Sequence, residues 1–169
     1  MSSNLKLIMS VSGDNYFCAH ASDDMSWTGP WDKKAFALLT CTEHGICGAG
    51  AATYKVMPPL LRGREIYKIS RTPSRDADTI SLSYFKDLAP HGWILGGPTF
   101  AKALFLTSQL GEIILCKNIV NLKNKFGELD KKYEASWLIN GLMDSQLWRI
   151  GNSIMLGDVL IQFWRRSHG

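Results

Sequence analysis

Apolar residues along the chain form short continuous runs that alternate with segments of helical spacing. The run LKLIMSV at 5–11 is almost uninterrupted, which is typical of a strand in the centre of a sheet. Further strand-like runs are at 44–50, 65–70, 79–83, 93–95, 110–118 and 157–167. Helical patterns are at 31–40, from 51 onward, and at 83–92, 98–106 and 133–142. Strands that alternate with helices predict an α/β domain with a central, mostly parallel sheet.

The helix expected after Pro30 carries one residue that its apolar face does not explain. Asp32 shares a face with Ala35, Phe36 and Leu39, because these residues follow the 3.6-residue period of a helix. A buried carboxylate without a partner is costly, so an acid in this position needs a reason. Capping the helix is one explanation, since an acid in the first turn interacts favourably with the helix dipole. Binding a ligand is the other.

Length, composition and charge restrict the function classes. The chain has 169 residues, 46% apolar and 20% charged, which fits one globular domain over 1–169. A net charge of +4 without a dense Lys/Arg run does not indicate nucleic-acid binding. The N-terminal apolar run is too short for a signal peptide or a membrane span. We therefore expect a cytoplasmic protein that acts on a small molecule, with no nucleic-acid or membrane partner.

The cysteines do not predict a metal site or a disulfide framework. They stand at 18, 41, 47 and 116, without a Cys-x-x-Cys pair or dense spacing. Zinc sites usually combine such pairs. We expect free thiols in a reducing compartment and no bound metal.

Two glycine-rich segments stand immediately before predicted helices. They read GAGAAT at 48–53 and GGPT at 96–99. Free N–H groups at a helix start can bind an anion, and glycine lets a ligand approach the backbone closely. The first segment lacks the third glycine of a dinucleotide fingerprint and does not follow the first strand, which excludes a Rossmann domain. A plain tight turn remains the alternative at 96–97.

The loop and helix from Met25 to Thr40 resemble, position for position, the substrate-binding element of dihydrofolate reductase. The shared pattern is Met-x-Trp-x-x-Pro-x-Asp-x-x-x-Phe-x-x-x-Thr. The resemblance covers roughly the first two thirds of the chain and its C-terminus. It implies a dihydrofolate-reductase-like fold with an antiparallel C-terminal strand and flanking helices. It also implies NADPH-dependent reduction of 7,8-dihydrofolate to tetrahydrofolate, in which Asp32 orients the pterin and supports its protonation.

The resemblance also assigns residues to the ligands. For the substrate it implies Met9, Ser10, Phe36, Met57, Leu61, Arg64 and Cys116, with Arg64 on a carboxylate. For a lid over the site it implies Met25 and Trp27. For the coenzyme it implies Ser10, Gly50, Thr53, Ser70, Arg71, Gly96, Gly97 and Thr99. Arg71 is the natural partner of a 2′-phosphate, which favours NADPH over NADH.

Departures from the family pattern leave other functions open. Ala51 and Ala52 stand where the family usually has a cation after Gly50, and Lys33 replaces an apolar residue beside the acid. One alternative is the related pyrimidine reductase of riboflavin synthesis, which shares the fold and NADPH and reduces a ribosylamino-pyrimidine. Another is a non-catalytic binding or structural descendant. Residues 119–157 contain no motif that can be placed, and we expect a monomer, with a dimer as the alternative.

Overall fold

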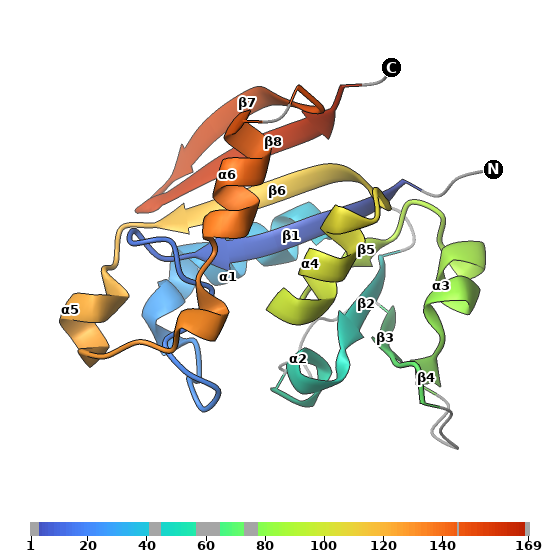
Figure 1. Ribbon diagram of the computed structural model, residues 1–169, viewed down its shortest axis with the longest axis horizontal. Coiled ribbons are helices and arrows are strands. Elements are labelled where there is room, and N and C mark those ends of the chain that lie inside the picture. The colour runs from blue at the N-terminus through green and yellow to red at the C-terminus, as the bar shows by residue number, and fades with distance from the viewer. Residues whose placement is uncertain (1–3, 41–44, 57–64, 73–77, 145, 168–169) are drawn as a thin grey trace. The chain divides into compact units, whose positions relative to one another are not determined.

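The computed structural model describes residues 4–40, 45–56, 65–72, 78–144 and 146–167 (Figure 1). The strands are β1 (Leu5–Val11), β2 (Ile46–Gly50), β3 (Glu65–Ile69), β4 (Thr79–Ile80), β5 (Trp93–Ile94), β6 (Leu110–Asn118), β7 (Trp148–Leu156) and β8 (Val159–Arg166). The α-helices are α1 (Gly29–Thr40), α2 (Ala51–Val56), α3 (Leu82–Leu88), α4 (Pro98–Leu106), α5 (Leu122–Phe126) and α6 (Ser136–Asp144). Short 3-10 helices occupy Ser26–Thr28 and Lys131–Tyr133.

The eight described strands hydrogen-bond in the order β4-β3-β2-β5-β1-β6-β8-β7. The pairs β1–β5, β2–β5, β2–β3 and β3–β4 are parallel, and β7–β8 is antiparallel. This is the mixed α/β sheet that the sequence predicts. The tertiary contacts group into two compact units, Met1–Ile8 with Phe36–Glu112 and Met9–Ala35 with Ile113–Gly169. The assignment of 1–169 to one domain stays a prediction.

The first unit contains the parallel strands β2 to β5. Gly48 lies in β2 beneath α3, and a Cβ atom there would come within 2.4 Å of the Ile69 side chain and 3.0 Å of Phe85. Phe85 is completely buried. Glycine at this point of the strand therefore lets α3 pack directly on the sheet, which buries the Phe85 ring.

One expected strand is shorter than predicted. The sequence predicts a strand over 79–83, but β4 ends at Ile80 and α3 begins at Leu82. Ser81 is the reason, because its hydroxyl accepts a hydrogen bond from the Tyr84 backbone N–H and caps the helix. The same helix, predicted over 83–92, already ends at Leu88.

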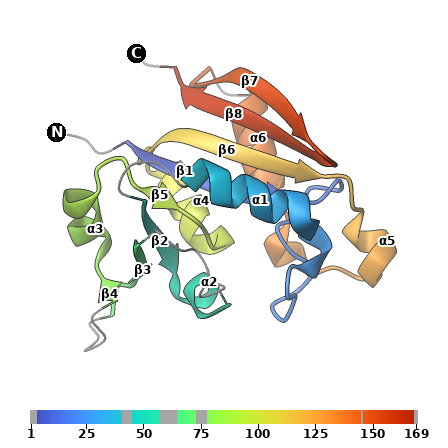
Figure 2. The ribbon, with the colours of Figure 1, turned by 180° about the vertical axis from the view of Figure 1, so that it is seen from behind.

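The second unit contains the antiparallel hairpin of β7 and β8, together with α5, α6 and the first residues of α1 (Figure 2). The sequence predicts β8 but not β7. A bulge interrupts the β7 register between Ile150 and Asn152, and most of β7 is exposed. Gly151, Asn152 and Ser153 are poor strand formers, so the sequence pattern of β7 is weak. Helix α6 begins at Ser136, three residues later than predicted.

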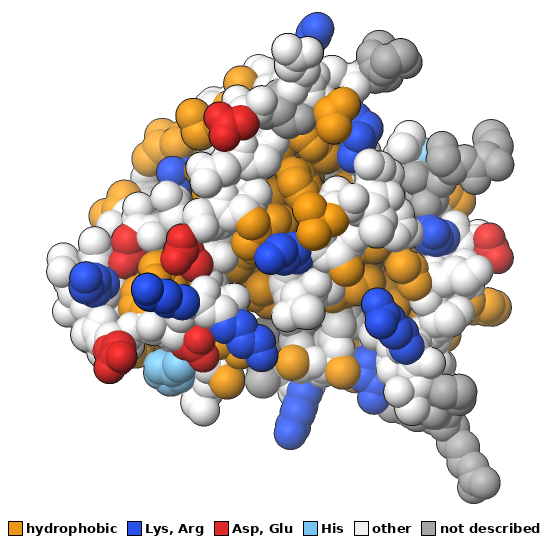
Figure 3. All heavy atoms as spheres, in the orientation of Figure 1, with side chains coloured by type: hydrophobic (Ala, Val, Ile, Leu, Met, Phe, Trp, Pro, Cys, Tyr) orange, Lys and Arg blue, Asp and Glu red, His pale blue; other side chains and the backbone are white. Residues whose placement is uncertain are grey.

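Most predicted elements are confirmed. The strands at 5–11 and 110–118 have the predicted bounds, and α4 begins at Pro98 as expected. No helix in the described ranges is both long and apolar enough to cross a bilayer. On the face drawn in Figure 3, Lys and Arg side chains lie scattered among Asp and Glu instead of forming one patch.

Candidate functional site

Asp32 lies in the first turn of α1 and is 5% exposed. Pro30 precedes it, in a position where proline favours a helix start. Among the described residues, the hydrogen bonds of Asp32 come from side chains on two strands and not from backbone N–H groups of its own helix. Helix capping therefore does not account for this acid.

Ser10 and Asn118 hold the Asp32 carboxylate. The Ser10 hydroxyl at the end of β1 donates to Asp32 Oδ1 at 2.7 Å. The Asn118 side-chain amide, at the end of β6, donates to the same oxygen at 3.1 Å. The amide also donates to the Val11 carbonyl oxygen at 3.3 Å, so that Asn118 ties the acid to β1. In the described part of the chain no hydrogen bond to Asp32 Oδ2 is found, and this oxygen can accept from a ligand.

The environment of Asp32 raises the pKa of its carboxyl group. Burial is the largest cause, since it disfavours the charged form. The hydrogen bonds from Ser10 and Asn118 act in the opposite direction, as does the charge of Lys33, while the charge of Asp158 raises the pKa further. The net effect is a carboxyl group that takes up a proton more readily than a solvated aspartate.

Cys116 lies on β6, two residues before Asn118, and is completely buried. Burial raises the pKa of its thiol, and the negative charge of Asp32 raises it further. Cys116 is therefore a neutral thiol near the acid, at the position that the sequence predicted. The sequence analysis did not identify Asn118. The period of two along β6 places Asn118 on the same face as Cys116, and this signal could have found it.

The residues predicted as a lid lie in a loop with its own hydrogen bonds. Asp23 accepts from the Trp27 indole N–H at 2.9 Å and from the Met25 backbone N–H at 2.8 Å. Trp27 is 5% exposed, so it belongs to the packed interior. Met25 has a left-handed backbone with φ of 62°.

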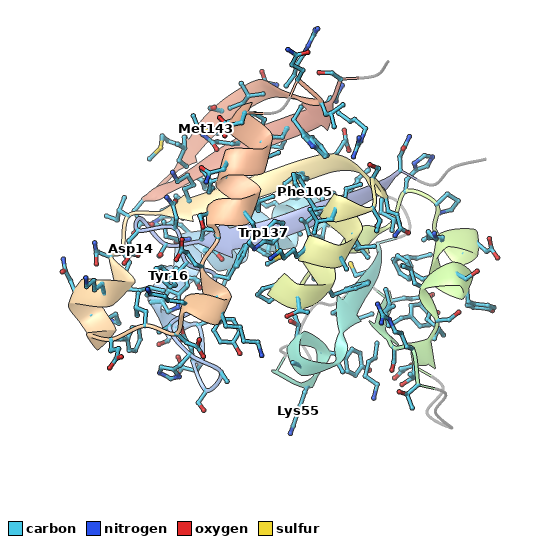
Figure 4. All side chains as sticks on the ribbon, viewed as in Figure 1. Asp14, Tyr16, Lys55, Phe105, Trp137 and Met143 are labelled. Atoms are coloured by element: carbon cyan, nitrogen blue, oxygen red, sulfur yellow. The ribbon has the colours of Figure 1, made fainter. Side chains whose placement is uncertain are left out.

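The same loop is joined to the segment between β6 and α6. The Gly13 N–H donates to the Val120 carbonyl at 2.7 Å, and the Phe17 N–H donates to the Tyr133 carbonyl at 2.9 Å. Asp14 accepts from the backbone N–H groups of Leu122 and Lys123 at 3.0 Å each, at the start of α5 (Figure 4). Residues 119–157, which carry no motif, thus hold this loop through their backbone.

The glycine-rich segments meet in the first unit. The Gly50 N–H donates to the Gly96 carbonyl at 2.8 Å, which joins the end of β2 to the residues before α4. A Cβ atom on Gly97 would lie 2.7 Å from Thr53 Oγ1. Gly97 is the N-cap of α4 and provides no side-chain cap, so the first N–H groups of this helix are available to an anion. Gly50, Thr53, Gly96 and Gly97 are therefore brought together, with Thr99 exposed in the first turn of α4.

The remaining predicted residues divide into two groups. Ser70 and Arg71 follow β3, with Arg71 exposed and the Ser70 hydroxyl accepting from the Thr72 N–H at 3.1 Å. Met9 is buried in β1, and Phe36 is half-buried one turn beyond Asp32 on α1. The residues predicted to bind the substrate tail lie outside the described residues: Met57, Leu61 and Arg64.

The residues present fit a dinucleotide in part. The close glycine backbones and the open first turn of α4 suit phosphate groups, and Arg71 supplies a cation. Ala51 and Ala52, exposed in the first turn of α2, supply no charge. In the described part of the chain, no three His, Cys, Asp or Glu side chains cluster as metal ligands.

Comparison with known proteins identifies the fold. No protein-family model matches the sequence, and no curated protein matches it. A solved structure named "Putative riboflavin biosynthesis protein", from Shewanella sp. PV-4, is similar with a TM-score of 0.68 and 11% sequence identity. The match covers 98% of this chain and 99% of that chain. The chain therefore has a dihydrofolate-reductase-like α/β fold.

Proposed function

We propose that this protein is an NADPH-dependent reductase of a heterocycle that contains a pyrimidine ring. The observation that carries the proposal is the buried carboxylate of Asp32. Its Oδ1 is held by two side chains, and its Oδ2 accepts no hydrogen bond from the described residues. A flat ring with an N–H group would satisfy this oxygen, since a buried carboxylate without enough donors is unfavourable.

The chemistry requires a hydride on a ring carbon and a proton on the adjacent nitrogen. NADPH supplies the hydride when it is bound. Asp32 accepts a hydrogen bond from the ring N–H and so fixes the orientation of the ring. Because burial raises the pKa of Asp32, its carboxyl group is closer to sharing a proton with the ring at neutral pH. The Ser10 and Asn118 side chains keep the carboxylate in one rotamer.

The chain offers residues that would hold the coenzyme. The backbones of Gly50, Gly96 and Gly97 and the first turn of α4 would lie against its phosphates. Arg71 would pair with the 2′-phosphate. The missing cation at Ala51 predicts weaker binding than a site with Arg or Lys at that position.

Two substrates fit the proposal, each supported by a different observation. A ribosylamino-pyrimidine is supported by the similarity of the fold to a protein named for riboflavin biosynthesis. Dihydrofolate is supported by the pattern from Met25 to Thr40, which places the acid and Phe36 on one helix.

The test is a spectrophotometric assay of NADPH oxidation with each substrate, using the parent protein and Asp32→Asn. The variant should lower kcat/KM by about 10²–10⁴-fold, the usual range for a group that supports proton transfer. For dihydrofolate, activity should partly return at low pH, where the substrate is protonated in solution. Asp87→Asn, at an exposed acid on α3, is the matched control and should leave the rate unchanged.

Two results would contradict the proposal. Equal rates for the parent and Asp32→Asn on an accepted substrate would remove Asp32 from the reaction. Failure to bind NADPH, measured by quenching of tryptophan fluorescence, would favour the non-catalytic alternative.

A further inference from the structure

The two donors that hold Asp32 converge on the same oxygen. Ser10 Oγ and Asn118 Nδ2 lie 2.7 and 3.1 Å from Asp32 Oδ1. A carboxylate oxygen has about two lone-pair sites in its plane, so these donors fill Oδ1. Only Oδ2 is left to a ligand by the described residues, and Asp32 therefore acts as a one-oxygen acceptor.

Pyrimidine rings differ in how many donors they present to a carboxylate. A 2-amino-4-oxo ring places an amino group beside a ring N–H, which gives two parallel donors. Such an edge suits both oxygens of a carboxylate, as the guanidinium group of arginine does. A 2,4-dioxo ring presents one N–H between two carbonyl groups and needs only one oxygen.

We propose that Ser10 and Asn118 make the Asp32 site selective for a 2,4-dioxo ring over a 2-amino-4-oxo ring. A two-donor edge would compete for an oxygen that is already filled and would leave one buried donor without a full acceptor. The inference rests on the proposed function, because it takes Asp32 as the group that binds the ring. Dihydrofolate carries the 2-amino-4-oxo edge, so the inference favours a dioxo pyrimidine as the substrate.

Asn118 is the residue that determines this specificity. Both N–H groups of its amide are used, one on Asp32 and one on the Val11 carbonyl, so the amide cannot turn away. It is 4% exposed, and replacement by leucine keeps its approximate volume. Asn118→Leu would free one side of Oδ1 while leaving the other groups that act on Asp32, namely Lys33, Asp158 and the thiol of Cys116, in place.

The test compares two probes that differ at one position of the ring. Lumazine (pteridine-2,4-dione) and pterin (2-aminopteridin-4-one) are titrated into the protein by fluorescence, at a pH where both are uncharged. The parent should bind lumazine about tenfold more tightly, the effect of one hydrogen bond to a charged group. In Asn118→Leu the preference should disappear or reverse. Asn140→Leu, at an exposed asparagine of α6, should keep the parent ratio.

A second variant keeps the test decisive if Asn118→Leu does not fold. Ser10→Ala removes the other donor to Oδ1 and should shift the ratio toward pterin in the same direction. Tighter binding of pterin by the parent, or a ratio that neither variant changes, would overturn the inference. A lumazine preference without NADPH oxidation would leave the inference standing and refute the proposed function. Binding of neither probe would overturn both.

Discussion

At the scale of single residues, the central feature is an acid that burial makes unfavourable and two neighbours make tolerable. Asp32 gains hydrogen bonds from Ser10 and Asn118, but the net effect of its surroundings is still a raised pKa. Stability is thus lower when this group is charged than it would be with a neutral side chain. An acid kept under these conditions is a common property of functional sites.

The first prediction concerns stability and pH. The folded pKa of Asp32 lies above its ordinary value of 3.8, so the folded state binds more protons and loses stability as pH rises through the interval above 3.8. Asp32→Asn keeps an oxygen that can accept from both neighbours and removes the charge. Its melting temperature at neutral pH should equal or exceed that of the parent, by about 2–4 °C for each kcal/mol gained.

Calorimetry of the parent and Asp32→Asn from neutral pH toward pH 3.8 measures this effect. The difference should shrink as the pH falls, because Asp32 itself becomes protonated. A variant that melts far below the parent at neutral pH would show that the charge stabilises the fold.

At the scale of elements, short contacts between backbones position the site more than large apolar surfaces do. The end of β2 meets the residues before α4 through Gly50 and Gly96, and Thr53 from α2 touches Gly97. The loop before α1 is tied to α5 by Asp14. These contacts are specific to particular residues, so each can be tested with one substitution and one compensating change.

Gly97→Ala should destabilise the protein by about 1–3 kcal/mol, the usual cost of adding a methyl group to a packed region. The new Cβ would stand 2.7 Å from Thr53 Oγ1. The double variant with Thr53→Ala should recover part of the loss, because the offending oxygen is gone. Urea unfolding of both single variants and the double variant gives the coupling energy. Strict additivity would contradict the predicted clash.

Asp14→Asn should loosen the connection between the loop and α5. Partial burial raises the Asp14 pKa, but hydrogen bonds from the Ser12 hydroxyl and the backbone of Lys123 and Leu122 lower it below 3.8 overall. The parent therefore gains stability from this group above pH 3.8 and loses it as the pH falls through the folded pKa. The variant should lose about 1 kcal/mol at neutral pH, since the group is partly exposed.

Thermal unfolding of Asp14→Asn against Asp87→Asn tests this, because both remove one carboxylate from the surface. The two variants should differ at neutral pH and converge in strong acid. Equal melting temperatures at neutral pH would show that the Asp14 contacts contribute nothing measurable.

The elements themselves were largely predictable, for a physical reason. Strands such as 5–11 and 110–118 are apolar because both their faces are covered, and this pattern is local in the sequence. The pattern fails for β7, which is exposed and contains a bulge, so no apolar period marks it. It also fails at Ser81, where one helix cap ends the strand earlier than the apolar run does.

At the scale of the whole molecule, the candidate substrate and coenzyme residues belong to different parts of the chain's contact pattern. Asp32, Ser10 and Cys116 belong to one compact unit, and Gly50 and Gly97 belong to the other. The fold of the whole chain is similar to that of a solved protein at only 11% identity. The function must therefore be established on this chain's own residues.

Coenzyme binding should be visible as a change in the stability of the whole chain. A ligand at 100 times its Kd adds about 2.7 kcal/mol to the folded state, which raises the melting temperature by several degrees. NADPH should raise the melting temperature more than NADH at equal concentration. In Arg71→Gln the difference between the two coenzymes should be largely lost, with NADH binding unchanged. Equal shifts for both coenzymes in the parent would remove Arg71 from the 2′-phosphate.

The sequence alone determined the α/β class, most element positions and the oddity of Asp32, because each follows from periodicity or residue chemistry within a short stretch. The tertiary structure decided how Asp32 is held. Ser10 and Asn118 are 22 and 86 residues away from it along the chain, and hydrogen bonds over such separations leave no local pattern. Only the folded sheet, which brings the ends of β1 and β6 to the start of α1, shows that both donors meet on one oxygen.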